Sequence, residues 1–438
     1  MNVDNTTLND LSIFAHEEEL SVFHRLDFAR TVGGRYWLKY YVDEPLGSIK
    51  LINDRQQLLQ RIIGILDKWP VSLNNGTIMM IEKYFESSVD TIPKSPDIIS
   101  ALSYKIFSGP DYSLIDYTVG HFIVFIKGMY TIVELLLSEN NAPELSTILE
   151  RISTLMKRPV LQNIVWHDVS KKLKKSDVLK IGHFLKYEFK SQCQDLIELY
   201  GRLDAFYSLA TSCEKYQFCF PEFAEVDRPQ LSAKQLYHPL LPVPVSYDIE
   251  LTEQQNFLFL TGANMAGKST FIKAIGVSVY LAHLGMGVPA KNMQLSYFDG
   301  LLSNIQVVDN IIKGESYFYN EVQRIHKTLE RISDGKKWLI LIDELFKGTN
   351  VQDAMKCSTV VIEGLRKMKN TAFILSTHLY EIGEGLKQYP NIQFRYFETE
   401  VNDGQLLFSY QLKNGISNDR LGYLILKKEG VVDMLEKL

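Results

Sequence analysis

Phe257-Leu-Phe-Leu-Thr-Gly262-Ala-Asn-Met-Ala-Gly267-Lys268-Ser269-Thr270 is the stretch that decides the fold of this chain. An apolar run typical of a buried strand ends at Gly262, and a helical pattern begins at Lys268. The spacing between them is the G-x-x-x-x-G-K-[ST] of a P-loop, in which backbone N–H groups surround phosphates at the start of a helix. An ordinary glycine turn is the alternative, but the strand before the loop and the helix after it favour a P-loop. The stretch therefore predicts a binding site for a nucleoside triphosphate.

The side chains of this loop predict how the triphosphate is held. Lys268 can reach the β- and γ-phosphates, which makes it both a binding and a catalytic residue. The Ser269 hydroxyl is a predicted ligand of Mg²⁺. The predicted nucleotide-binding residues are Gly262, Asn264, Met265, Gly267, Lys268, Ser269 and Thr270. ATP and Mg²⁺ are the cofactors that this pattern predicts.

A second apolar run, Trp338-Leu-Ile-Leu-Ile-Asp343-Glu344, ends in two acidic residues. Two acids at the end of a buried strand can simply mark the start of a solvated loop. In a chain with a P-loop, the same pattern is typical of a Walker B strand. We therefore predict that Asp343 holds Mg²⁺ through water and that Glu344 is the catalytic carboxylate that polarises the attacking water.

A third apolar run, Thr371-Ala-Phe-Ile-Leu-Ser-Thr-His378, places a histidine at the carboxyl end of a predicted strand. Ligands bind at this end of the strands in open α/β sheets. A lone histidine is more often structural, but its position one strand beyond Asp343 and Glu344 favours a γ-phosphate sensor. His378 is therefore a predicted catalytic residue.

Lys313-Gly-Glu-Ser316-Tyr-Phe precedes a stretch with helical periodicity. Apolar residues recur there at three- and four-residue steps, at Phe318, Val322, Ile325, Leu329 and Ile332. Ser316 is a natural N-cap, which is the structural alternative. The functional interpretation is that the helix N-terminus faces a γ-phosphate, with Ser316 as a catalytic residue. The motif itself leaves open which subunit's γ-phosphate that is.

The composition limits the possible partners and compartments. The 438 residues predict two or three domains, with 46% hydrophobic and 23% charged residues. The net charge of −5 gives no global basic field, so nucleic acid would have to be bound by a local patch or by encirclement. The most apolar windows, Phe122–Leu137 and Ala274–Ala290, are short for a membrane span and favour buried helices. We predict a cytoplasmic protein with no membrane contact and four reduced cysteines without metal-ligand spacing.

The chain changes character near residue 235, which predicts an all-α domain over 1–235 and an α/β P-loop domain with a mostly parallel sheet over 236–438. Helical periodicity dominates the first part, at Glu17–Tyr41, Ile49–Leu66, Ile115–Leu137, Ala142–Met156 and Asp177–Tyr216. Strand candidates alternate with helical segments in the second part, at Phe257–Thr261, Trp338–Ile342, Thr371–Ser376, Phe394–Thr399 and Leu406–Leu412. The length of Asp177–Tyr216 favours a lever-like arm.

The order of these motifs resembles the MutS family of DNA mismatch repair ATPases, which are relatives of the ABC-type ATPases. G-A-N-M-A-G-K-S-T, G-E-S-Y-F, D-E-L-F-K-G-T and S-T-H follow one another as the family's motifs do, and Asn264-Met265 is the most discriminating pair. Leu26-Asp-Phe-Ala-Arg-Thr31-Val-Gly33 resembles the start of the family's helical core domain. The resemblance implies a core and lever domain followed by an ATPase domain that pairs face to face in a homodimer. Ser316 would then complete the neighbouring subunit's site, and Gly415 to Gly422 would contribute to the dimer contact.

The chain also departs from the family pattern. It starts at the helical core, so we expect the family's mismatch-reading and connector domains to be absent. Glu315 and Tyr317 stand where the family has Arg and Thr, and a negative charge near phosphates opposes catalysis, so turnover is expected to be slow. Lys347 replaces another family Arg. Tyr247 is the nearest candidate for the aromatic residue that stacks on adenine.

Lys171-Lys172-Leu-Lys174-Lys175 is the densest basic run and a candidate for sequence-independent DNA phosphate contact. A charge run is also commonly just a solvated helix face. The resemblance and these residues predict an ATPase that binds and hydrolyses ATP as a homodimer to gate double-stranded or branched DNA in mismatch repair or recombination, recognising structure rather than mismatches. The alternative is an ATP-switched clamp on a protein or ribosomal partner. A small-molecule kinase fits poorly, because no lid with clustered arginines is evident.

Overall fold

The computed structural model describes residues 1–167, 172–305, 317–402, 405–417 and 431–435. These residues form two compact units. The sheet unit comprises Met1–Arg25, Pro45–Ile52 and Tyr216–Leu438, and the helical unit comprises Leu26–Glu44 and Asn53–Lys215. The predicted domain boundary lies at residue 235, whereas the sheet unit begins at Tyr216 and also includes two N-terminal segments. In the first of these segments, Asn2 and Val3 pair with Gly300 and Leu301 as neighbouring strands.

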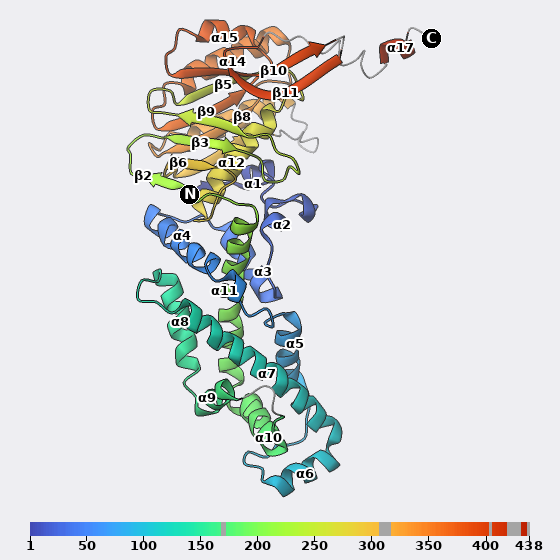
Figure 1. Ribbon diagram of the computed structural model, residues 1–438. Coiled ribbons are helices and arrows are strands. Elements are labelled where there is room, and N and C mark those ends of the chain that lie inside the picture. Colours follow the sequence, from blue (N-terminus) through green and yellow to red (C-terminus); the bar gives the residue numbers. More distant parts are fainter. Residues whose placement is uncertain (168–171, 306–316, 403–404, 418–430, 436–438) are drawn as a thin grey trace. The chain divides into compact units, whose positions relative to one another are not determined.

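A seven-stranded sheet organises the sheet unit (Figure 1). In spatial order its strands are β1 (Asn2–Val3), β7 (Gly300–Asn304), β8 (Trp338–Asp343), β9 (Thr371–Ser376), β5 (Phe257–Thr261), β10 (Ile392–Asn402) and β11 (Gln405–Asn414). Every neighbouring pair is parallel except the antiparallel pair β10 and β11. All residues of β5, β8 and β9 are buried, which explains why these strands are continuous apolar runs in the sequence. The predicted mostly parallel α/β sheet is confirmed.

A second sheet of four strands also belongs to this unit, in the order β2 (Glu222–Ala224), β6 (Asn292–Ser296), β3 (Leu231–Leu236) and β4 (Tyr247–Leu251). Its strands are short, and β4 alternates buried and exposed residues. None of them was among the predicted strands, since such short alternating segments carry little apolar signal.

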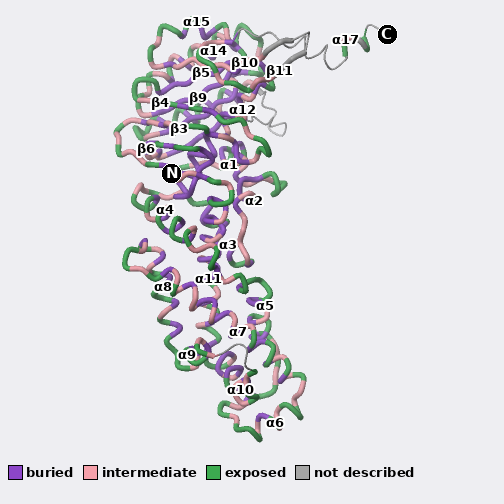
Figure 2. The backbone as a smooth tube through the Cα atoms, in the orientation of Figure 1, coloured by how far each residue is buried: buried purple, intermediate pink, exposed green. Residues whose placement is uncertain are grey.

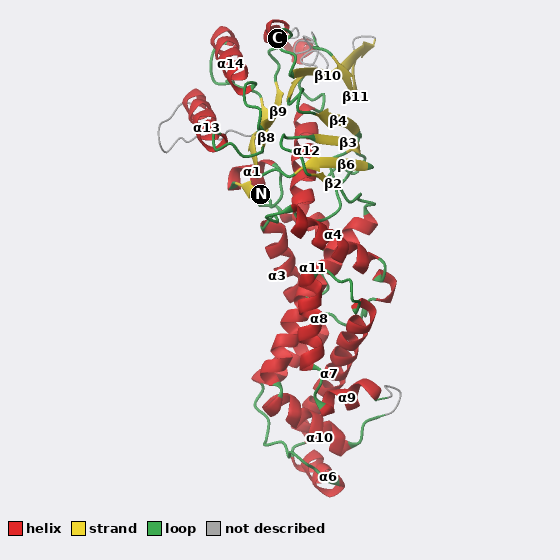
Figure 3. Cartoon of the chain, turned by 90° about the vertical axis from the view of Figure 1, so that its left-hand side faces the viewer, coloured by secondary structure: helices red, strands yellow, loops and turns green. Residues whose placement is uncertain are grey.

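Helices cover both faces of the larger sheet. The helices of the sheet unit are α1 (Asn5–Asp10), α12 (Lys268–His283), α13 (Tyr317–Ile332), α14 (Val351–Leu365), α15 (Glu381–Leu386) and α17 (Val431–Leu435), while α2 (Val22–Leu26) and α4 (Ile49–Ile63) include residues of both units. α13 and α14 lie on one face, and α12 lies on the other, between the two sheets (Figure 3). Because α12 is enclosed, it is buried on nearly all sides (Figure 2).

The helical unit contains α3 (Val32–Asp43), α5 (Asn75–Glu86), α6 (Ile98–Phe107), α7 (Gly109–Leu136), α8 (Pro143–Leu155), α9 (Pro159–Trp166), α10 (Lys175–His183) and α11 (Lys190–Lys215). The long helix predicted over Asp177–Tyr216 is interrupted by a π-helical turn, Phe184–Glu188. The rings of Phe184 and Phe189 stack with their centroids 5.0 Å apart, and both side chains are buried. A π-helical turn holds one residue more than an α-helical turn. Here it brings the rings of Phe184 and Phe189 onto one side of the chain.

The continuous helix predicted over Glu17–Tyr41 is also wrong. α2 ends at Leu26, and the next helix, α3, begins only at Val32. Asp204, fully buried on α11, accepts hydrogen bonds from the backbone N–H groups of Arg30 (3.0 Å) and Thr31 (2.8 Å). Thr31 caps α3 by accepting from the Gly34 N–H at 2.9 Å. A Cβ at Gly34 would lie 2.0 Å from a carboxylate oxygen of Asp204, so this position requires glycine.

Replacing Asp204 with alanine is expected to destabilise the protein by about 3 kcal/mol, since the buried N–H of Thr31 and the partly buried N–H of Arg30 lose their acceptor. Burial raises the pKa of Asp204 to about 6, although the hydrogen bonds from Thr31 and Arg30 oppose this rise. A carboxyl group with a raised pKa contributes more stability as pH falls. The difference in thermal midpoint between wild type and Asp204→Ala should therefore grow from pH 8 to pH 5, as followed by circular dichroism. A difference that shrinks over this range would contradict the assignment.

Among the described residues, α7 is the one helix long and apolar enough to cross a membrane. Half of its most apolar window is buried within the protein, and a core helix meets the same criterion. Its buried residues include Phe122, Phe125 and Met129.

Candidate functional site

All of the predicted nucleotide-binding residues except Gly262 line one cavity of about 650 Å³ in the sheet unit. The loop before α12, the end of β8 and the residues before β4 supply most of its lining: Leu241, Val243, Val245, Tyr247, Asn264, Met265, Gly267, Lys268, Ser269, Thr270, Asp343, Glu344, Lys347 and Tyr410. The cavity lies at the carboxyl ends of parallel strands, where open α/β sheets bind ligands. Its volume is in the range of sites for small organic ligands.

The loop between β5 and α12 needs glycine at its last position. Gly267 has φ +106°, and a Cβ there would lie 3.3 Å from the ring of Tyr410. Gly262 has φ +141°, and Met265 adopts φ +70°, an unusual value for a residue with a side chain. These left-handed conformations bend the loop back over the start of α12, which gives the strand–loop–helix arrangement that the sequence predicts.

Lys268 lies inside this loop with only 5% of its surface exposed. Its ammonium group donates hydrogen bonds to the carbonyl oxygens of Gly262 (2.8 Å) and Ala263 (2.9 Å). Burial lowers the pKa of Lys268, while the charges of Glu344 and Asp343 act in the opposite direction. Lys268 is thus a nearly enclosed cation within the loop.

Asp343 ends β8 with both carboxylate oxygens accepting hydrogen bonds from hydroxyl groups. Ser269 donates to one oxygen, and Ser376, at the end of β9, donates to the other. A hydroxyl beside a carboxylate is a donor set that fits Mg²⁺, which takes oxygen ligands and completes its shell with phosphates and water. In the described parts of the chain, no three His, Cys, Asp or Glu side chains cluster as a metal site by themselves. The residues therefore fit a Mg²⁺ ion that arrives with a phosphate ligand.

Glu344 follows Asp343 in a strained backbone conformation, with φ +64°. One carboxylate oxygen lies 3.0 Å from the Lys347 ammonium, and the other lies 3.7 Å from His378 Nδ1. Burial alone would raise the pKa of Glu344, but the nearby His378 and the charge of Lys347 lower it to about 2. The structure thus brings His378 beside Glu344, and it adds Lys347, which was not among the predicted site residues.

Two predicted features lie wholly or partly outside the described residues: the segment with Glu315 and Ser316, and the predicted dimer segment Gly415 to Gly422, of which 418–422 are not described. Ser316 and Glu315 precede α13 and are not described. The predicted apolar stripe of α13 is correct for Ile325 and Ile332, which are buried. Val322 and Leu329, which were predicted to lie on the same buried stripe, are each 38% exposed.

Two tyrosines form an aromatic wall of the cavity. Tyr247 is buried and makes edge-to-face contacts with Phe271 (5.2 Å between centroids) and Phe397 (5.6 Å). Burial raises the pKa of Tyr247 to about 12. Tyr410, which is 40% exposed and has φ +53°, reaches the cavity from β11. Tyr247, the predicted candidate for stacking on adenine, lines the cavity, and its role stays a prediction. Tyr410 was not predicted, since no local motif marks it.

Comparison with known proteins agrees with this geometry. Residues 258–435 match the family model for MutS domain V. The DNA mismatch repair protein MutS of Staphylococcus haemolyticus is 27% identical over 252 residues, which are 56% of this chain and 28% of that protein. MutS protein homolog 4 of Homo sapiens is 32% identical over 246 residues, which are 53% of this chain and 25% of that protein. Residues 258–435 of this chain are a MutS domain V.

This MutS domain V holds most of the site described above. Gly262, Lys268, Asp343, Glu344 and His378 all lie within residues 258–435. The match to the DNA mismatch repair protein MutS of Thermotoga maritima, 28% identical over 268 residues, covers 58% of this chain and 33% of that protein. The matches therefore span about a quarter to a third of the length of these relatives.

Proposed function

We propose that this MutS-family protein binds ATP in the 650 Å³ cavity and hydrolyses it, as a homodimer, to gate DNA binding in mismatch repair or recombination. The observation that carries the proposal is the convergence of Lys268, the Ser269–Asp343 pair and Glu344 on one cavity. A cation, an oxygen-donor pair and an ionised carboxylate are the groups that phosphoryl transfer to water requires.

In this proposal each residue acts on the triphosphate end of ATP. The backbone N–H groups of the loop and the start of α12 bind the phosphates, and Lys268 neutralises charge on the β- and γ-phosphates. Ser269 and Asp343 hold Mg²⁺, which supplies charge compensation at the phosphates. Glu344, whose pKa of about 2 keeps it ionised at neutral pH, orients the attacking water. His378, beside Glu344, is placed to sense the γ-phosphate.

The aromatic and aliphatic wall is the proposed site for the base. Tyr410 presents a partly exposed ring, while Leu241, Val243 and Val245 provide apolar surface nearby. An aromatic ring and an apolar surface suit a flat purine. Tyr247 supports this wall from within the aromatic cluster with Phe271 and Phe397. We therefore propose Tyr410, supported by Tyr247, as the adenine contact.

The dimer and the DNA ligand follow from the family resemblance. Ser316 is proposed to complete the partner subunit's site, as it would in a face-to-face pair of ATPase domains. The relatives named MutS are DNA mismatch repair proteins, which favours DNA over a protein or ribosomal partner. Within the basic run, Lys172, Lys174 and Lys175 are exposed, and Lys171 lies outside the described residues.

The test is the affinity for homoduplex, mismatched and four-way-junction DNA, with and without ATP, at two salt concentrations. A triple variant, Lys172→Ala, Lys174→Ala and Lys175→Ala, should weaken binding to all three DNAs and reduce the slope of log K against log salt by about 0.9 per lost phosphate contact. A control triple variant at the exposed residues Lys68, Lys83 and Lys105 removes the same charge elsewhere. Wild-type binding that prefers the junction would support structure-specific recognition. If no DNA binds at low salt, the protein-partner clamp becomes the better explanation.

A further inference from the structure

Glu321 is a buried acidic residue on α13 with no role in the function proposed above. Only 6% of its surface is exposed. Its carboxylate oxygens accept hydrogen bonds from the backbone N–H groups of Lys347 (3.1 Å) and Gly348 (3.2 Å). A buried carboxylate is costly unless it is hydrogen-bonded, and here both of its oxygens are used on one short loop. Glu321 therefore fixes the backbone three and four residues after Glu344.

The loop that Glu321 holds is strained. Glu344 and Phe346 both have positive φ, +64° and +60°. Such conformations persist only where surrounding contacts determine them. α13 supplies two of these contacts, because Phe318 packs against Phe346 with ring centroids 5.7 Å apart and Glu321 binds the next two N–H groups. The orientation of Glu344 and of Lys347, its ion-pair partner, thus depends on α13.

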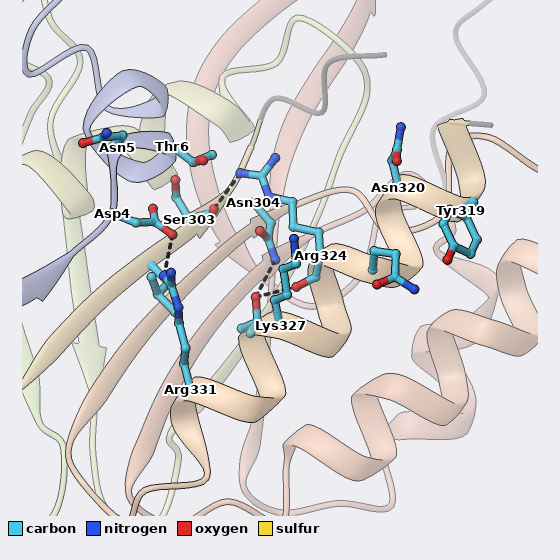
Figure 4. Close-up of a pocket in the computed structure, with 13 residues that line it drawn as sticks. Asp4, Asn5, Thr6, Ser303, Asn304, Tyr319, Asn320, Arg324, Lys327 and Arg331 are labelled. Carbon is cyan, nitrogen blue, oxygen red and sulfur yellow. Dashed lines mark hydrogen bonds and ion pairs between the residues drawn. The ribbon is translucent and has the colours of Figure 1, made fainter. Parts of the chain in front are cut away.

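α13 is also anchored to the rest of the sheet unit by two arginines. Arg324, one turn after Glu321, donates to Asp10 of the N-terminal segment (3.2 Å) and to the carbonyl oxygen of Ser303 at the end of β7 (2.8 Å). Arg331 pairs with Asp4 at 2.6 Å. Figure 4 shows Arg324 directed toward Ser303 and Arg331 directed toward Asp4, across a polar pocket of about 700 Å³. α13 is therefore held between the N-terminal segment and the loop that carries Glu344.

We propose that Glu321 is a positioning residue for ATP hydrolysis, which couples α13 to Glu344 and Lys347. The inference rests on the proposed function, since it assigns Glu344 to the hydrolytic step. Glu321 itself lies outside the lining of the nucleotide cavity. It acts by fixing the N–H groups of Lys347 and Gly348, so the Glu344 carboxylate faces the attacking water in one orientation. A displacement of α13 would then change the hydrolysis rate without changing the residues that bind ATP.

Glu321→Gln tests this inference. Glutamine keeps one acceptor oxygen but presents an N–H group to the second backbone N–H, so the loop is expected to lose its fixed geometry. The kcat for ATP should fall about ten- to hundredfold, the loss that corresponds to one hydrogen bond to a charged group. The Kd for ATP should stay within about twofold of wild type, because the cavity lining is intact. Hydrogen exchange at the N–H groups of Lys347 and Gly348 should accelerate by about tenfold or more.

The matched control is Glu330→Gln, which removes the same charge from an exposed position of α13 beside His326. It should leave kcat, ATP affinity and amide exchange unchanged. A Glu321→Gln variant with wild-type kcat would overturn the proposal, as would one that loses ATP affinity and thermal stability in parallel with kcat. If Glu321→Gln does not fold, Glu321→Asp decides, since it keeps the charge and shortens the side chain by one methylene. A fall in its kcat at unchanged Kd supports the coupling, and a wild-type kcat refutes it.

The proposed function and this inference fail in different ways. If the wild-type protein binds ATP but does not hydrolyse it, the proposed function is wrong. The exchange rates at Lys347 and Gly348 then still show whether Glu321 holds the loop. If the wild-type protein hydrolyses ATP and Glu321→Gln does so equally fast, only the positioning role is lost.

Discussion

Replacing Lys268 with alanine is expected to weaken ATP binding by at least about a hundredfold, because charge-assisted hydrogen bonds to two phosphate groups are lost. The side chain is already enclosed by the loop, with its ammonium group on the carbonyl oxygens of Gly262 and Ala263. Little ordering entropy is therefore left to lose when phosphates bind. Isothermal titration calorimetry with ATP and Mg²⁺ measures the change directly.

The control for Lys268→Ala is Lys291→Ala, which removes an exposed lysine of the same unit outside the cavity. It should bind ATP as wild type does. Both variants should keep their secondary structure, since α12 is held by the apolar packing of residues such as Phe271 and Ile275. ATP affinity in Lys268→Ala equal to that of wild type would show that the nucleotide binds elsewhere.

The parts of the fold that the sequence predicts are those with a continuous apolar signal. β5 and β9 have the predicted bounds, because strands buried on both faces leave an unbroken apolar run. The four-stranded sheet carries no such signal. β2 has three residues, and β4 alternates, so their pairing with β6 and β3 depends on contacts that only the folded chain makes.

Helix boundaries were missed where a distant residue determines them. Nothing local in Glu17–Tyr41 shows that the N–H groups of Arg30 and Thr31 bind Asp204, which lies more than 170 residues away in the sequence. The break at Phe189 similarly reflects its packing on Phe184 within the core. Periodicity predicts which residues face the core but not where tertiary contacts stop the helix.

The candidate site divides in the same way. Lys268, Ser269 and Asp343 were predictable, because each acts within a local motif whose spacing sets its position. Ser376 and Tyr410 reach the site from β9 and β11, and their roles depend on the neighbours that the sheet gives them. Sequence motifs therefore identify the cavity residues of the loop and the strand end better than those that other strands bring to the cavity.

Replacing Glu344 with glutamine is expected to lower the rate of ATP hydrolysis by about 10²- to 10⁴-fold while ATP still binds, since a general base contributes a factor of this size. Glutamine has the shape of glutamate, so the cavity is preserved, but it cannot accept a proton from water. ATP then remains bound, and the closed dimer should accumulate. Single-turnover hydrolysis and light scattering with ATP measure the two effects.

The same substitution also tests the electrostatics around Glu344. Its pKa of about 2, below the ordinary value of about 4.3, means that its ion pairs stabilise the folded state above pH 4.3 and that this contribution is lost as pH falls toward 2. Glu344→Gln should therefore be less stable than wild type at pH 7, and the difference in thermal midpoint should narrow below pH 4. Glu384→Gln, which removes the same charge from the exposed pair with Lys387, should change neither stability nor turnover appreciably. Equal hydrolysis by Glu344→Gln and wild type would exclude the catalytic role. A slow variant with unchanged stability would instead show that the contacts of Glu344 with Lys347 and His378 do not stabilise the folded state.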